Sequence, residues 1–169
     1  KLVLATSNKG KLAEIAPIVQ AFGFQALPQS DFGFVDAEES GLTFVENALI
    51  KARHACMQTG LPALADDSGI IIDALNGAPG LISAHYAGVH GDSAGNIAKV
   101  LAELSQLENP VRTARFYCCM VLLKHADDPQ PIIAEGIWHG EILSAPLGEH
   151  AFGYDPIFWD PNFQQSAAQ

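Results

Sequence analysis

The chain has 169 residues, of which 49% are hydrophobic and 17% charged, so it can bury a sizeable core and is too apolar to be disordered. Its net charge of −10 is opposite to that of proteins that bind nucleic-acid polymers or anionic membranes. No apolar run approaches the ~20 residues that span a bilayer, and three cysteines do not make a disulfide framework. We therefore expect one cytoplasmic domain over residues 1–169, with neither a membrane nor a nucleic acid as its partner.

The N-terminal part is predicted to form a strand, a helix and a second strand. Residues 2–5 are apolar and typical of a buried strand. Residues 11–22 repeat apolar side chains at helical spacing, and Gly23 supplies a stop signal. Pro17 lies inside this helix and should kink it. Residues 24–27 indicate the second strand. The buried stripe of the helix is expected to comprise Leu12, Ile15, Val19 and Phe22.

The segment that joins the first strand to the first helix combines small polar side chains with two lysines. It comprises Thr6, Ser7, Asn8, Lys9, Gly10 and Lys11. A helix N-terminus presents unpaired N–H groups and positive dipole charge, so this segment is suited to phosphate oxygens. It lacks the spacing of a Walker loop. The alternative is an ordinary strand–helix turn with solvated lysines.

An acidic, irregular stretch at residues 28–42 leads into a second predicted helix. Thr43 and Glu46 form a capping box, and the helix should run to Thr59 before Gly60 ends it. Asn47, Lys51 and His54 share a polar stripe of this helix. Lys51 is either an exposed helix lysine or a second cation aimed at the same phosphates as Lys11.

The strongest catalytic candidates are the adjacent acids Asp66 and Asp67, in a polar break between predicted strands at residues 61–65 and 70–73. Neighbouring side chains of a strand point in opposite directions, so the two carboxylates should have different roles. One would bind a hard cation or accept a proton, while the other orients nearby groups. The alternative is a tight turn in which the acids cap local amides.

Glu38 and Glu39 are weaker candidates for site residues, because adjacent acids in a loop are usually solvated. They gain a role only if the loop folds back toward Asp67. Magnesium is commonly held by one or two carboxylates, with waters and substrate phosphates as further ligands. Glu39 and Asp67 would then suffice for a Mg²⁺ site.

The C-terminal half alternates loops with regular elements. A loop is predicted at residues 76–92, a helix at 93–107, a long strand at 112–124, one or two strands at 131–143 and a short strand at 157–159. The whole pattern indicates an α/β fold with parallel and antiparallel strands mixed in one sheet.

A cluster of aromatic, glycine and acidic residues precedes the last predicted strand. It comprises Phe152, Gly153, Tyr154 and Asp155. One interpretation is a slot for a planar ligand, with a ring that stacks and a carboxylate or backbone group that reads a base edge. The other is a hydrophobic turn.

These motifs, in this order, resemble those of the inosine triphosphate pyrophosphatase family, also described as non-standard purine nucleoside triphosphatases, and its bacterial branch above all. The matching segments are 6–11, 39–48, 51–52, 65–69, 77–80 and 152–155. The resemblance implies an elongated α/β fold in which helices flank a long mixed sheet, with two lobes around a central cleft, usually as a homodimer. It implies Mg²⁺-dependent hydrolysis of ITP, dITP and XTP to the monophosphate and pyrophosphate.

The resemblance also implies roles for individual residues. Residues 6–11 would hold the triphosphate, and residues 152–155 would line the base pocket. Asp67 would activate water as the proton acceptor and bind Mg²⁺ with Glu39. Ser68 would contact the substrate, and Lys51 would steady phosphate charge.

Two departures from the family pattern bear on these expectations. Family members commonly continue past a stretch like residues 165–169 into a helical tail that touches base and phosphate. His85 stands where the family usually has arginine. If the tail is missing, the alternative is a nucleotide-binding protein with little turnover. A third hypothesis is a related pyrophosphatase that acts on modified pyrimidine or other purine triphosphates.

Overall fold

The computed structural model describes residues 1–150 and 152–169, which form two compact units. The first unit contains Lys1–Asp67 and Cys118–Glu135, and the second contains Ser68–Tyr117 and Gly136–Gln169. No helix in these residues is long and apolar enough to cross a membrane. The single-domain organisation and the central cleft stay predictions.

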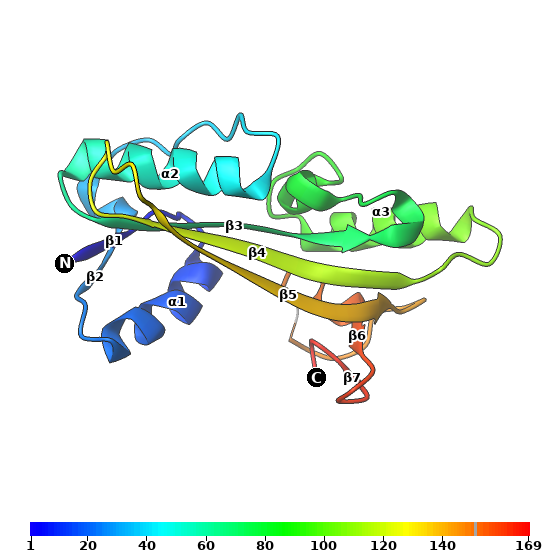
Figure 1. Cartoon of the computed structure of the whole chain (residues 1–169). Coiled ribbons are helices and arrows are strands. Elements are labelled where there is room, and N and C mark those ends of the chain that lie inside the picture. The colour runs from blue at the N-terminus through cyan, green and yellow to red at the C-terminus, as the bar shows by residue number, and fades with distance from the viewer. Residues whose placement is uncertain (151) are drawn as a thin grey trace. The chain divides into compact units, whose positions relative to one another are not determined.

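Seven strands form one mixed sheet in the order β2-β1-β3-β4-β5-β6-β7 (Figure 1). They are β1 (Leu2–Leu4), β2 (Ala26–Pro28), β3 (Ala63–Ile72), β4 (Thr113–Leu123), β5 (Ile132–Ile142), β6 (Phe158–Asp160) and β7 (Gln165–Ser166). β1 runs parallel to β2 and β3, whereas β6 runs antiparallel to β5 and β7. With helices beside these strands, the predicted α/β class is confirmed.

In the first unit, α1 (Lys9–Ala21) packs on one face of β1. Val19 is buried there beside Leu2 and Leu4, with Leu12 and Ile15 partly buried. The helix continues through Pro17 without interruption. Phe22 was wrongly predicted as buried. It caps the helix C-terminus and is 78% exposed, because the chain turns away at Gly23, whose φ is +83°.

The second helix of this unit, α2 (Phe44–Thr59), has the predicted boundaries. The Thr43 hydroxyl accepts a hydrogen bond from the Glu46 amide, and Gly60 ends the helix in the left-handed conformation. Three alanines of α2 are completely buried, namely Ala48, Ala52 and Ala55. Their small side chains allow the helix backbone to lie close to its neighbours. In Figure 1, α1 and α2 lie on opposite faces of the strands of this unit.

The polar break predicted between two strands does not exist. β3 runs unbroken from Ala63 to Ile72, with Asp66 and Asp67 in its middle. Buried carboxylates are tolerated in a strand when they have hydrogen-bonding or ionic partners, and both acids have them. The sequence pattern does not reveal those partners, which come from α1 and α2.

The second unit is built around α3 (Ser93–Ser105), whose buried stripe contains Ile97, Val100 and Leu104. These residues pack with Ile70, Ile72, Ile157 and Phe158 in one core cluster. The segment 76–92, predicted as a loop, contains the 3₁₀ helix Gly80–His85 and a bridge between Ile71 and Pro79. Of the one or two strands predicted at residues 131–143 the structure has one, β5, and β7 is absent from the prediction.

Candidate functional site

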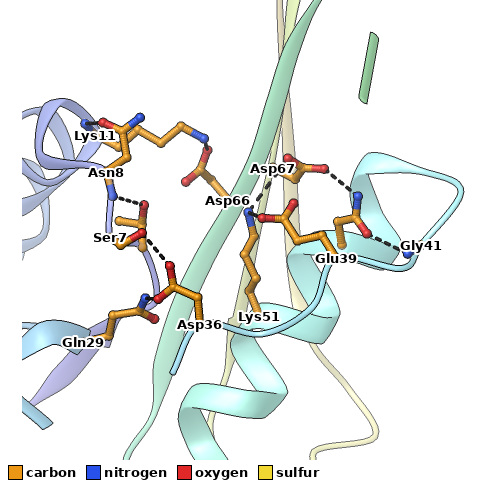
Figure 2. Close-up of polar contacts among 12 residues, drawn as sticks. Ser7, Asn8, Lys11, Gln29, Asp36, Glu39, Gly41, Lys51, Asp66 and Asp67 are labelled. Carbon is orange, nitrogen blue, oxygen red and sulfur yellow. Dashed lines mark hydrogen bonds and ion pairs between the residues drawn. The ribbon is translucent and has the colours of Figure 1, made fainter. Parts of the chain in front are cut away.

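The two acids of β3 point to opposite faces of the strand and meet different partners (Figure 2). Asp66 is 4% exposed, and its Oδ2 accepts a hydrogen bond from Lys11 Nζ at 2.6 Å. Asp67 is 6% exposed, and its Oδ2 accepts from Asn47 Nδ2 at 3.1 Å. Its Oδ1 lies 3.8 Å from Lys51 Nζ. Asp66 therefore faces α1, while Asp67 faces α2.

The segment before α1 holds its shape through its own side chains. Asn8 Oδ1 accepts hydrogen bonds from the amides of Gly10 and Lys11, at 2.9 and 3.2 Å, and so caps the helix. Thr6 Oγ1 accepts from the Asn8 amide. Ser7 Oγ donates to a carboxylate outside the segment. These contacts preorganise the predicted phosphate loop, and its lysines, Lys9 and Lys11, supply its positive charge.

Lys51 joins two carboxylates that lie far apart in the sequence. It follows Asn47 by four residues, so both side chains project from the same face of α2. Its Nζ lies 3.2 Å from Glu39 Oε1 as well as 3.8 Å from Asp67 Oδ1. The acidic loop therefore folds back toward Asp67, the condition under which Glu39 gains a role.

The pKa of Asp67 is raised above its ordinary value. Burial is the main cause, because a charged carboxylate loses its hydration in the interior. The Lys51 ammonium and the hydrogen bond from Asn47 act in the opposite direction, and the charge of Glu39 adds to the increase. A buried carboxylate with a raised pKa beside a lysine is a common arrangement for a general base.

The donor set fits a hard divalent cation. Glu39 and Asp67 offer carboxylate oxygens beside the same ammonium group, and such oxygens are the ligands that Mg²⁺ prefers. Within residues 1–150 and 152–169, no three His, Cys, Asp or Glu side chains gather as a metal-binding cluster. Two protein carboxylates with water or phosphate oxygens would complete the coordination of Mg²⁺, whereas zinc would require more protein ligands.

Sequence reasoning missed Asp36, which orders the phosphate loop. Its Oδ2 accepts from Ser7 Oγ at 2.7 Å, and its Oδ1 accepts from Gln29 Nε2 at 2.5 Å. The His54 ring of α2 contacts Val35 O at 2.7 Å and so ties the acidic stretch that carries Asp36 to this helix. Asp36 follows Ser7 by 29 positions, and no periodic pattern links the two, so the sequence gives no signal for this pair.

The remaining predicted site residues belong to the second unit. Ser68 is its first residue. Tyr154 is buried, and its hydroxyl donates to Ser83 O at 2.8 Å, while burial raises its pKa. Phe152 is exposed, and Asp155 begins a short 3₁₀ helix. Gly153 lines a largely apolar cavity of about 360 Å³ with residues of α3. His85 stacks on His90.

Known proteins match this chain over nearly its whole length. The sequence model of the Ham1 family matches residues 2–169. The dITP/XTP pyrophosphatase of Xylella fastidiosa is 57% identical over all 169 residues, which cover 85% of that protein. That of Vibrio cholerae is 52% identical, with 84% covered. The structure of a HAM1 protein from Coxiella burnetii superposes with a TM-score of 0.92 at 50% identity, over 99% of this chain and 85% of that one.

Proposed function

The chain belongs to the Ham1 family, and we propose that it hydrolyses the non-standard purine nucleoside triphosphates ITP, dITP and XTP. The products are the nucleoside monophosphate and pyrophosphate, so the enzyme removes deaminated purines from the nucleotide pool. The observation that carries this proposal is the network in which Glu39, Lys51 and Asp67 meet beside β3.

Binding of the triphosphate requires positive charge, which this chain of net charge −10 must concentrate locally. Lys11 and Lys51 provide it, since each pairs with a carboxylate of β3 and the charges of both lysines act on Asp67. Residues 6–11 add the first amides of α1, whose dipole favours anions. In this proposal, residues 6–11 bind the triphosphate, and Lys51 stabilises the negative charge of its phosphates.

The chemical step is attack of water on the α-phosphorus, and it needs a base. Asp67 accepts the proton of the attacking water, a role favoured by its raised pKa. Lys51 stabilises the charge that develops on the phosphate oxygens. Glu39 and Asp67 would hold Mg²⁺, which neutralises phosphate charge when bound. Since a protonated Asp67 cannot accept a proton, kcat/KM should fall on the acidic side of its pH profile.

Base selection is assigned to residues 152–155 together with Ser68 as a substrate contact. The hydroxyl of Tyr154 already donates a hydrogen bond to Ser83 O, so Tyr154 fixes the segment. The exposed ring of Phe152 would stack on a base. The carboxylate of Asp155 or a backbone group would read the base edge. Donors arranged for a 6-oxo group are left unpaired by the 6-amino group of adenine, which lowers the rate strongly.

We also propose that the protein acts as a homodimer in the cytoplasm. β5 exposes four large apolar side chains, namely Ile132, Ile133, Ile137 and Trp138. Ile133 and Ile137 share one face of β5, because side chains alternate along a strand, and a second copy of the chain would cover this exposed pair.

The proposal is tested by measuring pyrophosphate release from ITP with and without Mg²⁺, for the wild type and for Asp67→Asn. We expect release only from the wild type with Mg²⁺, while the variant still binds ITP. The exposed acid Asp127→Asn is the matched control and should retain activity. Binding of ITP without any pyrophosphate release by the wild type would favour a nucleotide-binding protein without turnover.

The same assay addresses the substrate. ITP, dITP and XTP should be hydrolysed faster than ATP and GTP. Equal rates for ITP and ATP would contradict a site that reads the 6-oxo group, and faster hydrolysis of dUTP would favour a pyrimidine substrate.

A further inference from the structure

We propose that Asn47 is a positioning residue, which orients the carboxylate of Asp67 and couples it to the loop that carries Glu39. This inference rests on the proposed function, because it concerns the same cation and the same base. Asn47 itself would touch neither the substrate nor the cation.

Both the nitrogen and the oxygen of the Asn47 side-chain amide form hydrogen bonds. It is 4% exposed, its Nδ2 donates to Asp67 Oδ2 at 3.1 Å, and its Oδ1 accepts from the Gly41 amide at 2.8 Å (Figure 2). A flipped amide would place its oxygen against the carboxylate and its NH₂ group against the N–H of Gly41. Only one orientation therefore satisfies both partners.

This arrangement gives the two oxygens of Asp67 different surroundings. Oδ2 is held by Asn47, whereas Oδ1 lies toward Lys51, whose ammonium also contacts Glu39. These contacts restrict the rotation of the Asp67 carboxylate. They also direct its Oδ1 toward the side where the carboxylate of Glu39 lies. Partners that orient a metal-binding carboxylate typically contribute 10- to 100-fold to metal affinity or activity.

The other end of Asn47 holds the loop. Gly41 lies so close to the start of α2 that a Cβ at this position would come within 2.6 Å of Glu46 Cβ and 2.7 Å of Asn47 Oδ1. The next amide, that of Leu42, donates to Glu46 Oε2 at 2.8 Å. Glu39 stands two residues before Gly41, so the hydrogen bond from Gly41 to Asn47 also sets the position from which Glu39 reaches Lys51.

The experiment compares Asn47→Leu, which keeps the side-chain shape and removes both hydrogen bonds, with the wild type. Binding of Mn²⁺ is followed by electron paramagnetic resonance without substrate, and kcat and KM are measured for ITP. We expect the Kd for Mn²⁺ to rise about 10-fold or more and kcat to fall by a similar factor. At saturating Mg²⁺, KM for ITP should change little, since the phosphate loop is untouched.

The matched control is Asn96→Leu in the second unit. Asn96 is also a buried asparagine whose side-chain nitrogen and oxygen both form hydrogen bonds. Its Nδ2 donates to Ser83 O and Ala84 O, and its Oδ1 accepts from the Ala87 amide. Both variants should lower the melting temperature, because each leaves buried polar groups without partners. Only Asn47→Leu should weaken Mn²⁺ binding.

Gly41→Ala provides a second test that leaves Asn47 in place, and it applies even if Asn47→Leu does not fold. The added Cβ should push the loop away from α2 and weaken Mn²⁺ binding. Unchanged Mn²⁺ binding by Gly41→Ala would overturn the coupling to the loop. Unchanged Mn²⁺ binding and kcat in a folded Asn47→Leu would overturn the positioning role. A wild type that neither binds Mn²⁺ nor releases pyrophosphate would instead refute the proposed function.

Discussion

The two side chains of the Lys11–Asp66 ion pair differ in how deeply they are buried. The carboxylate of Asp66 is 4% exposed, whereas the side chain of Lys11 is 22% exposed. Asp66 Oδ1 is buried and has no hydrogen-bond partner among residues 1–150 and 152–169. Removal of Lys11 would leave a buried carboxylate without compensation, while removal of the carboxylate charge lets the lysine turn toward solvent.

We predict that Lys11→Met lowers the free energy of unfolding by about 3 kcal/mol, within the range measured for broken buried ion pairs. Asp66→Asn should have a smaller effect, since no buried charge remains. Urea unfolding at neutral pH measures both values. The exposed neighbour Lys9→Met is the control, and equal losses for Lys11→Met and Asp66→Asn would contradict the prediction.

Sequence reasoning identified several residues of the network but not the contacts that join them. The adjacent acids, the capping box and Lys51 are visible in the sequence because each has a local pattern. Asp36 is not visible, since it reaches Ser7 from a loop without periodicity. Asn47 was placed on a polar stripe, but its two partners depend on how the loop before α2 folds back.

The strand β3 shows where a secondary-structure prediction from sequence fails. The residues at 66–69 carry turn signals, yet the strand continues through them. At Gly69, a Cβ would come within 2.3 Å of Gly80 O and 2.7 Å of Ser83 Oγ. The glycine is therefore required by the close approach of another backbone segment rather than by a turn, and spacing alone does not distinguish the two.

Gly69→Ala should destabilise the protein by about 1–3 kcal/mol, the usual effect of overpacking a tight interior. Gly136→Ala in β5 is the matched control, because a Cβ there would meet no heavy atom within 4 Å. Thermal and urea unfolding of both variants provide the comparison. A Gly69→Ala protein as stable as the control would show that the segment 80–83 can move aside.

Net charge and the exposed face of β5 act in opposite directions on self-association of the protein. Ile133 and Ile137 lie on the same face of the strand, because side chains alternate along it. Both are exposed, and their burial would favour a dimer. The charge of −10 on each chain opposes association, and salt reduces this repulsion.

We predict that the double variant Ile133→Glu/Ile137→Glu is a monomer under conditions where the wild type is a dimer, and that the wild-type dimer tightens as salt is added. Light scattering coupled to size-exclusion chromatography measures the mass directly. Ile18→Glu, at an exposed apolar position of α1, is the control and should leave the dimer intact. A double variant that is still dimeric would place the interface elsewhere.

Three strands, β3, β4 and β5, each contribute residues to both compact units. The polypeptide thus passes from one unit to the other after residues 67, 117 and 135, each time inside a strand. Neither unit corresponds to one continuous stretch of coding sequence. A single recombination breakpoint therefore cannot exchange one unit for that of a homologue, and a functional chimera would need junctions at all three crossings.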